Sequence, residues 1–536
     1  MNAVITIPAV PAEMSGTPPQ LKHWAVYPQK IVEPEHDPNA WQQTRMRTVA
    51  SGENLFDRPL NSGDKIILDF GEPVVGTFHF VFDTVTQYAD SPVRIKLVAG
   101  ELPYEVTAPL DTYRGTLSRA WIQDEVVNID NLPGKCVLPR RYSCRYLAIE
   151  LIAVPGQLLI KDLFILAEGA ESDLPPSPIE LEPEMAAIDR VGIRTLRNCM
   201  QTCFEDGPKR DRRLWCGDLR LQAMVNAVSY RRFDLVERSL YLLAGCADED
   251  GRIPGCVFER PEPIRGCQTL SYALLFAVVL EEHCRWSGRL DIGRDLFPIA
   301  SHQFDLVRPY CHADGVFHDL NALTPFWIFV DHQAELDVHA AFQGIYIFAL
   351  KALSRLARQL HQPMVADRLN QEAEKMVAGA RNAFYDNRSG LVYSGPNRQL
   401  SCASQIWMIL CGALTPTEGR RALDALDKTP GALMPVSPYM YHYYLEACEV
   451  CGDRLRLEQT IRNYWGKMVE HGADTFWEVF VPGDDFFSPY GDPRLNSACH
   501  AWSCTPSYFL RSAKTGEKSL KRKLEIMNPG PEYISA

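Results

Sequence analysis

The chain of 536 residues lacks long hydrophobic runs, and no segment approaches the roughly 18 uncharged apolar residues of a membrane-spanning helix. The first 16 residues contain two prolines and no Lys or Arg, so they lack the basic and apolar regions of a secretory signal. The net charge is −12, and the only dense basic run, Lys518–Lys523, lies in the tail. A negative field of this kind argues against nucleic acid or an anionic membrane as the main partner. These absences predict a cytoplasmic protein that binds neither.

Patterns typical of a metal centre or a disulfide framework are also missing. The 16 cysteines are scattered, and Cys199, Cys203 and Cys411 lie in apolar surroundings, where a free thiol packs as a small hydrophobic group. The single C-x-x-C motif, Cys448 to Cys451, has no second pair at zinc spacing. A large cytosolic chain is not expected to depend on disulfides. We therefore predict no metal ligands and no cofactor.

Residues 60–170 show apolar and polar residues that alternate with a period of two. In GTFHFVFDT the side chains of Phe78, Phe80 and Phe82 share one face, with polar residues between them. Several short segments of this kind, separated by turn signals and without helical patterns between them, predict an antiparallel β-sandwich. The region ends at a segment with four prolines and five acids in 14 residues, which indicates a linker or a surface strap.

After this linker the period becomes helical. Ile188, Val191, Leu196 and Cys199 form an apolar stripe with a repeat near 3.6 residues. Later segments such as LSYALLFAVVL are apolar on all sides, which indicates burial in a large helical domain. About a dozen helices without the fixed repeat of a solenoid favour a closed ring of helical hairpins. The predicted organisation is an N-terminal segment 1–59, a β-sandwich 60–170, a linker 171–184, a helical domain 185–512 and a tail 513–536.

One charged stretch, EDGPKRDRRLWCGD at residues 205–218, lies between two expected helices. Such a run is usually a solvated loop, and Asp218 can be explained as the N-cap of the next helix. Asp206 and Asp211 have no such role, and they lie beside Trp215. Loops on a rigid scaffold often hold catalytic groups. Carboxylates next to an indole suit a sugar, because they accept hydroxyl hydrogen bonds while the ring covers C–H groups.

A second stretch, residues 471–503, is unusually long for a connection between helices and is rich in aromatic side chains. Loops of this length inside a compact domain are usually functional or disordered, and the aromatic content argues against disorder. The stretch contains Glu478 directly after Trp477, and His500 precedes the last expected helix.

A third stretch, residues 324–335, contains Trp327 and Asp331. Asp331 is explained equally well as an acid at a helix start and as a ligand contact. Carboxylates that come from distant loops of a helical domain are what inverting glycoside hydrolysis requires. One acid protonates the leaving oxygen while a second carboxylate activates water on the opposite face. The three stretches together predict a carbohydrate-active enzyme.

The motifs resemble those of one known family. DGPKRDRRLWCGD is similar to the D-C-P-Q-R-D-E-R-L-G-W-x-G-D signature of bacterial α-L-rhamnosidases of glycoside hydrolase family 78. GADTFWEVF and NSACHAWS resemble that family's G-A-T-x-x-W-E and S-x-x-H segments, in the same order. The resemblance covers residues 60–512 and implies a β-sandwich followed by an (α/α)6 barrel. It also implies hydrolysis of terminal α-L-rhamnosides with inversion and without a metal in the reaction.

The resemblance also implies roles for single residues. Glu478 matches the general base, Asp206 and Asp218 match acids that hold sugar hydroxyls, Trp215 matches the pocket indole, and His500 matches a histidine near the sugar. Trp327 and Asp331 correspond to a pocket segment less closely, and His332 stands where an indole is often found. The expected substrate-binding residues are Asp206, Arg210, Trp215, Asp218, Trp327, Asp331, Trp477 and His500.

The chain departs from the family at the general acid, which is usually a Glu. No Glu lies between Asp206 and Asp218. Aligned on Asp218, Asp211 takes the position of the acid, whereas aligned on Asp206 the position falls to Arg212, which cannot donate a proton near neutral pH. We therefore expect Asp211 to be the acid, with an acid elsewhere or none as the alternatives. An acid must be protonated before it acts, and close approach of Arg210 or Arg212 would oppose this.

Two further functions remain open from the sequence alone. The chain could be an inverting glycosidase of another sugar specificity, because one fold hosts many, or a sugar-binding protein that lost its acid. The chain ends soon after the helical domain, so the C-terminal β-domain common in the family is not expected. A compact enzyme that acts on small rhamnosides is consistent with this organisation. The sequence does not specify the oligomeric state, and a homodimer is only a working assumption.

Overall fold

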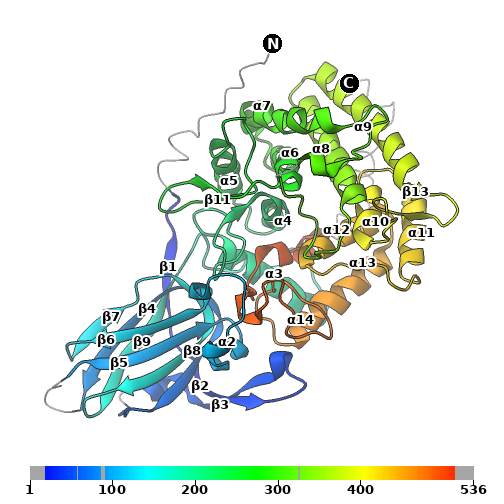
Figure 1. Ribbon diagram of the computed structural model, residues 1–536. Coiled ribbons are helices and arrows are strands. Elements are labelled where there is room, and N and C mark those ends of the chain that lie inside the picture. The colour runs from blue at the N-terminus through cyan, green and yellow to red at the C-terminus, as the bar shows by residue number, and fades with distance from the viewer. Residues whose placement is uncertain (1–17, 57, 86–90, 324–325, 513–536) are drawn as a thin grey trace.

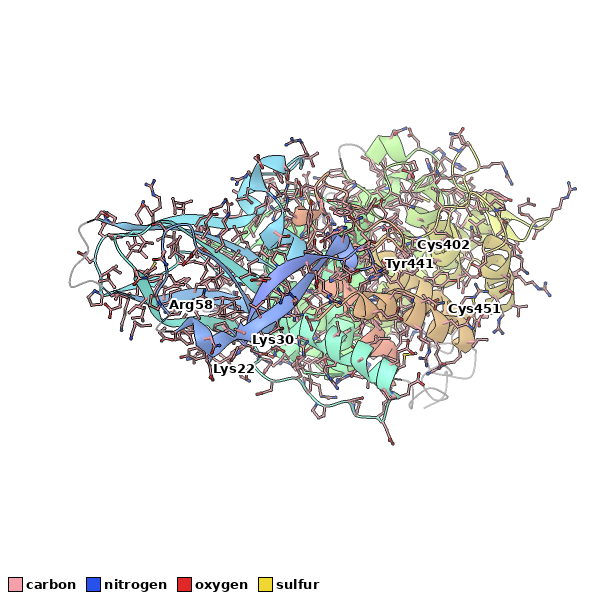
Figure 2. The ribbon with its side chains drawn as sticks, turned by 90° about the horizontal axis from the view of Figure 1, so that it is seen from below. Lys22, Lys30, Arg58, Cys402, Tyr441 and Cys451 are labelled. Atoms are coloured by element: carbon pink, nitrogen blue, oxygen red, sulfur yellow. The ribbon has the colours of Figure 1, made fainter. Side chains whose placement is uncertain are left out.

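The computed structural model describes residues 18–56, 58–85, 91–323 and 326–512. The chain forms a sheet-rich part and a helical part that lie side by side (Figure 1). Figure 2 shows Lys22, Lys30 and Arg58 on the sheet side and Cys402, Tyr441 and Cys451 on the helical side. Within the described ranges, no helix combines the length and apolar character needed to cross a membrane. The start of the chain and the predicted tail from residue 513, with its basic run, lie outside these ranges.

The sheet-rich part is one sheet of nine antiparallel strands. Its strands are β1 (Lys22–Val26), β2 (Lys30–His36), β3 (Thr44–Ser51), β4 (Lys65–Thr84), β5 (Val93–Gly100), β6 (Gln123–Ile129), β7 (Gly134–Val137), β8 (Tyr142–Ala153) and β9 (Leu158–Gly169). The main order is β1-β9-β4-β8-β5-β6, while β2 pairs with β3 and β4, and β7 pairs with β4. Three strands precede residue 60, so the sheet begins at β1 and the expected boundary at residue 60 does not separate it from the N-terminal segment.

The long strand β4 organises the core of this sheet. Phe78, Phe80 and Phe82 are buried there and the residues between them are less so, which confirms the predicted alternation. β4 pairs with β9 from Gly76 opposite Ala167 onwards. A Cβ atom at Gly76 would lie 2.2 Å from the carbonyl oxygen of the neighbouring strand, so glycine is needed for this close approach. The domain therefore gains its core from alternate residues of paired strands.

The helical part follows the linker. Its longer helices are α3 (Pro183–Cys199), α4 (Cys216–Ala227), α5 (Phe233–Gly245), α6 (Leu270–Ser287), α7 (Leu290–Val307), α8 (His339–Gln359), α9 (Pro363–Phe384), α10 (Cys402–Leu410), α11 (Pro416–Leu426), α12 (Pro438–Val450), α13 (Arg454–Thr460) and α15 (Pro506–Ser512). Contacts run from α4 to α6, α8, α10 and α12 in turn, and η9 (Ala501–Ser503) contacts both α12 and α4. The intervening helices α5, α7, α9 and α11 pack against their neighbours in this succession (Figure 1). The succession thus returns to its start.

Two details near the start of α4 differ from the sequence expectations. α4 begins at Cys216 with Trp215 as its N-cap residue, so Asp218 lies in the first turn and is not the cap. A three-stranded sheet of β10 (Leu214–Trp215), β11 (Cys256–Phe258) and β12 (Ile264–Arg265) was not anticipated, because its strands are too short for a periodic signal. It pairs Trp215 with Cys256 and so fixes the indole to the scaffold.

The sheet-rich part holds both loops that carry the expected site. Glu101 follows β5, and Glu105 lies in α2 (Pro103–Thr107). The buried Lys209 donates a hydrogen bond to Glu105 at 3.0 Å and lies 3.4 Å from Glu101. The amide of Ala498 donates to the same oxygen of Glu101, Oε2, at 2.5 Å. The 205–218 loop and the 471–503 loop are therefore both attached to Glu101.

Candidate active site

The two loops meet in a pocket of about 360 Å³ at the N-terminal ends of α4 and α6. The expected site residues that line it are Asp206, Arg210, Asp211, Trp215, Asp218, Trp327, Glu478 and His500. Its charged floor is deeply buried, since Asp206 is 4% exposed and Glu478 only 2%. Its rim is open and aromatic, since Trp327 is 49% exposed. This gradient matches a site that holds a polar group at its base and leaves the rest of a ligand near the surface.

Glu478 is held by four hydrogen bonds. One terminal nitrogen of Arg210 donates to both carboxylate oxygens at 2.7 Å. The hydroxyl of Tyr490 donates to Oε1 at 2.6 Å, and the amide of Ser497 donates to Oε2 at 2.9 Å. The guanidinium also lies over the ring of Tyr490, with its central carbon 4.1 Å from the ring centroid. These contacts fix the carboxylate in one orientation.

The charge of Glu478 follows from the same contacts. Burial opposes ionisation, but Arg210, His500, His332 and the Ser497 amide outweigh it and lower the pKa of Glu478 to about 2. Burial lowers the pKa of His500 to about 3, so that ring is neutral near neutral pH and Arg210 is the permanent cation. Glu478 is therefore a carboxylate at every pH where an enzyme of this kind would work.

The opposite wall carries acids in a different state. Burial, together with the charge of Asp211, raises the pKa of Asp206 to about 8. Burial and Asp206 raise the pKa of Asp218 well above its usual range, although the hydroxyl of Tyr272 donates to it at 3.3 Å. These carboxyls therefore hold protons near neutral pH while Glu478 does not. They can both donate and accept hydrogen bonds, as a cluster of sugar hydroxyls requires.

Two buried polar atoms of the pocket-lining residues lack a hydrogen-bond partner in the part of the chain that the structure describes. Oδ1 of Asp218 and Nδ1 of His500 are buried, lie 3.9 Å apart, and have no hydrogen-bond partner within the described residues. Nε2 of the same histidine lies 3.7 Å from Asp206. Buried polar groups are normally paired, so unpaired atoms that face a pocket indicate a place for a bound hydroxyl.

Asp211 lies between two guanidinium groups. Arg210 donates to its Oδ1 at 3.1 Å, and Arg213 lies 3.5 Å from its Oδ2. Arg212, which the sequence placed near the acid, turns away and donates instead to main-chain oxygens, including that of Arg141 at 2.8 Å. One guanidinium thus joins Asp211 to Glu478, and the two carboxylates share a single pocket.

Two expected substrate-binding residues lie outside the pocket lining. Asp331 accepts hydrogen bonds from the amides of His332, Val436 and Ser437 and from the Ser437 hydroxyl at 2.6 Å, so it fixes the start of α12. Trp477 packs against Trp41, with ring centroids 4.7 Å apart, on the far side of its segment. A sugar in the pocket would therefore not contact either side chain directly.

Other lining residues were not identified from the sequence. Tyr490 was noted only as one of several aromatic residues, and Tyr272 was hidden in an apolar helix where its hydroxyl was the only signal. Leu117 and Trp121 come from the sheet-rich part, because the loop before β6 reaches the rim. No local pattern could have placed them there, since the contact spans two domains.

Two family models match the chain. The N-terminal domain of glycosyl hydrolase family 78 α-rhamnosidases matches residues 28–161. The bacterial α-L-rhamnosidase 6 hairpin glycosidase domain matches residues 182–513. The second model alone covers more than half of the chain, and it contains both site loops. Among curated proteins, none gives a significant sequence match.

Solved structures agree with these models. A rhamnosidase from Klebsiella oxytoca with rhamnose bound shares 39% sequence identity with this chain. The match covers 94% of this chain and 98% of the Klebsiella chain, with a TM-score of 0.91. The family 78 rhamnosidase of Bacillus sp. GL1 shares 19% identity over 88% of this chain, with a TM-score of 0.73. The Streptomyces avermitilis α-L-rhamnosidase complexed with L-rhamnose shares 13% over 92%, with a TM-score of 0.62. The chain covers 49% and 44% of these last two, which are similar in fold alone.

Proposed function

The chain belongs to the α-L-rhamnosidases of glycoside hydrolase family 78 and is a glycoside hydrolase, and we propose that Glu478 is its general base and Asp211 its general acid. The enzyme releases terminal α-L-rhamnose from rhamnosides. The observation that supports these roles is the pocket itself, which brings an ionised carboxylate and a second acid from a distant loop to either end of one guanidinium. Inverting enzymes hold their two carboxyl groups roughly 6.5–9.5 Å apart, which leaves room for a water.

On the base side, Glu478 activates the attacking water. Its four hydrogen bonds, from three donor groups, leave no free lone pair, so the water must replace one of them. Tyr490 donates through a neutral side-chain hydroxyl that can rotate, whereas Arg210 is held by the Leu495 carbonyl and the amide belongs to the main chain. We propose that the water displaces the Tyr490 hydroxyl when substrate binds.

On the acid side, Asp211 delivers a proton to the leaving oxygen, and for this it must be protonated when substrate is bound, although Arg210 and Arg213 lie beside it. Asp206 is its rival, because burial keeps that carboxyl protonated near neutral pH and the Asp211 amide donates to it at 3.3 Å. We assign Asp206, Asp218 and His500 to the sugar hydroxyls, because all three line the pocket and Asp218 and His500 each have an unpaired polar atom among the described residues. Trp215 and Trp327 cover the C–H face of the sugar and the rim.

The finer features of the fold and setting are also proposals. We propose that the nine strands pack as a β-sandwich and that the helices form an (α/α)6 barrel, which the succession of contacts supports. We propose small rhamnosides as substrates, because the pocket has a volume of only about 360 Å³. A cytoplasmic setting is supported by sixteen free thiols, which are typical of reducing compartments. No described contact bears on a homodimer.

The reaction is tested with an aryl α-L-rhamnoside followed by proton NMR from the first minute. We expect the first sugar released to be β-rhamnose, which then mutarotates. Glu478→Gln is expected to lower kcat by about 10²–10⁴-fold, with KM little changed, because only the base is lost. The conservative Asp173→Asn in the linker is the control. Release of α-rhamnose first would contradict inversion, and near-normal turnover by Glu478→Gln would contradict its role as the base.

The identity of the acid is tested by changing the leaving group. A dinitrophenolate leaves without a proton, whereas an alcohol or a sugar does not. Asp211→Asn is therefore expected to lower kcat/KM by about 10²–10⁴-fold for an alkyl rhamnoside and far less for dinitrophenyl rhamnoside. Asp206→Asn should impair both substrates alike, because it acts on the sugar. If only Asp206→Asn shows the leaving-group dependence, the acid is Asp206. If binding persists but no variant or wild-type protein turns over either substrate, the chain is a sugar-binding protein.

A further inference from the structure

A pair of cysteines lies at the mouth of the pocket and has no part in the reaction above. All sixteen cysteines fall within the described residues, and Cys267 alone is classed as exposed. It follows β12 and lines the pocket. Cys256 begins β11 and is buried, its carbonyl accepts from the amide of Gly266, the residue before Cys267, and the two thiols lie close enough to shift each other's pKa. The two sulfurs are thus neighbours, one open to solvent and one behind it.

The local backbone makes room for this pair. The amide of Gly266 donates to the carbonyl of Cys256 at 2.8 Å, and the amide of Gly255 donates to that of Cys267 at 2.8 Å. A Cβ atom at Gly266 would lie 2.4 Å from the sulfur of Cys256. Any larger residue there would push that sulfur away, so the glycine keeps the two thiols in reach of each other.

The surroundings of Cys267 favour its thiolate. Hydrogen bonding from Cys256 lowers the pKa of Cys267 to about 6, with further help from Thr269, 3.7 Å away, and from the charge of Arg213, although burial opposes it. The same hydrogen bond and burial raise the pKa of Cys256, so it keeps its proton. Thiolate character, access to solvent and an adjacent second thiol are what distinguish redox-sensitive cysteines from inert ones.

We propose that Cys267 is a peroxide-reactive thiol at the mouth of the catalytic pocket, and that Cys256 resolves it as a disulfide that lowers turnover. In the first step the thiolate attacks hydrogen peroxide, the O–O bond breaks, an S–O bond forms, and hydroxide leaves. In the second step the Cys256 sulfur attacks the sulfenic acid, the S–S bond forms, and the S–O oxygen leaves as water with the Cys256 proton. Sulfur loses two electrons and peroxide gains them.

The pair is connected to the site on two sides. Cys256 pairs with Trp215 across β10 and β11, so a disulfide acts on the strand that carries the pocket indole. Arg213, whose charge stabilises the Cys267 thiolate, also lies 3.5 Å from Asp211. Oxidation of Cys267 replaces its thiolate with a neutral sulfur, so Arg213 loses a negative charge in its surroundings. The effect on turnover rests on the proposed function, whereas the chemistry of the thiols does not.

The modification is tested by mass spectrometry on the full-length protein, reduced and then treated briefly with hydrogen peroxide. We expect a peptide that links Cys256 to Cys267 and lacks two hydrogens, which dithiothreitol restores. In Cys256→Ser, dimedone should instead trap a sulfenic acid on Cys267. Cys311→Ser, which removes a half-buried thiol elsewhere, should still form the link. A different cysteine oxidised first, or both thiols still fully alkylated by N-ethylmaleimide, would overturn the proposal.

A second measurement needs no variant and so does not depend on whether one folds. In the native wild-type protein, iodoacetamide should label Cys267 at least several-fold faster than Cys311, and equal rates would contradict the proposal. The activity ratio of treated to untreated enzyme should fall in the wild type, recover with dithiothreitol, and stay constant in Cys267→Ser. An unchanged ratio in an active wild type would refute the effect on turnover. Absence of rhamnosidase activity in the untreated wild type would contradict the proposed function, whereas the mass-spectrometric test of the thiols would remain valid.

Discussion

The two walls of the pocket carry carboxylates of opposite character, although all of them are buried. Glu478 has a pKa lowered to about 2, whereas Asp206 on the facing wall has a pKa raised to about 8. Burial pushes both pKa values up, so it cannot explain the difference. The difference comes from the neighbouring charges, because Arg210 donates to both oxygens of Glu478, whereas the charge of Asp211 adds to the effect of burial on Asp206.

The comparison shows how one pocket can hold a base and proton-bearing groups at the same pH. The base needs a charge, and a fixed guanidinium supplies the compensation. The acids that we propose to hold the sugar, Asp206 and Asp218, must donate as well as accept, and burial together with mutual repulsion keeps protons on them. Asp211 lies at the boundary, with Arg210 on one side and Asp206 on the other. The division of roles is therefore a division of electrostatic environments.

The largest expected effect comes from removing the cation. Arg210→Met leaves Glu478 buried without its main partner, and breaking such a pair costs about 3–5 kcal/mol of folding free energy. Burial then raises the pKa of Glu478, so the acidic limb of kcat/KM moves to higher pH. In the wild type that carboxylate stabilises the fold above its unfolded pKa, and this contribution is lost only as the pH falls towards about 2. In the variant, where burial sets the pKa of Glu478 above its ordinary value of 4.5, the sign reverses, and stability is lost as the pH rises through that pKa.

The measurement is a pair of profiles, kcat/KM and the midpoint of urea unfolding, from pH 3 to pH 8. Arg210→Lys keeps the charge but not the bidentate contact, and it should lie between the wild type and Arg210→Met. Acidic limbs at the same pH in all three proteins would show that the cation does not set the charge of Glu478.

The sequence predicted the carboxylates of both walls, but it did not predict the contacts that hold Glu478. Motifs located Glu478, Asp206 and Asp218, and the structure places them in one pocket. Motifs could not show that Arg210 would join Glu478 to Asp211, because that contact depends on two loops folding against the sheet-rich part. They gave no reason to single out Tyr490, whose contact with Glu478 depends on the path of the loop between them.

Neighbours in sequence also misled the prediction. Trp477 and Asp331 were both expected in the pocket because their segments resemble pocket segments of the family, although Asp331 was explained equally well as an acid at a helix start. In these two loops, adjacent side chains point in different directions. Glu478 therefore faces the pocket while Trp477 faces Trp41, and His332 lines the pocket while Asp331 holds Ser437. Motif resemblance identifies a segment, whereas the direction of each side chain is set by packing.

A smaller effect is expected on the facing wall, in the empty enzyme. The pKa of Asp206 is higher in the folded state than its ordinary value of 3.8, so the folded state holds the extra proton between about pH 4 and pH 8. Stability therefore falls as the pH rises through this window. Asp206→Asn cannot ionise, so its melting temperature should exceed that of the wild type at pH 8 by a few degrees, and the gap should close at pH 4.

The control for this prediction is Asp173→Asn in the exposed linker, which should follow the wild type at every pH. Glu105, whose pKa burial raises to about 7, produces a fall of the same sign in all three proteins, so the difference between them is the quantity to measure. Parallel melting curves for Asp206→Asn and the wild type from pH 4 to pH 8 would show that Asp206 is ionised in the empty pocket.

The smallest effect is expected from Tyr490→Phe, which tests the base wall without disturbing its cation. The variant loses the 2.6 Å hydrogen bond to Glu478 but keeps the ring over Arg210. A hydrogen bond to a charged group contributes about 1.5–3 kcal/mol, and the incoming water recovers part of this, so a change in kcat of about tenfold or less is expected. Tyr490→Leu removes the ring as well and should cost more. If Tyr490→Phe instead matches Arg210→Met in its acidic limb, then the hydroxyl, and not the guanidinium, sets the charge of the base, and the contrast between the two walls must be attributed to a hydrogen bond.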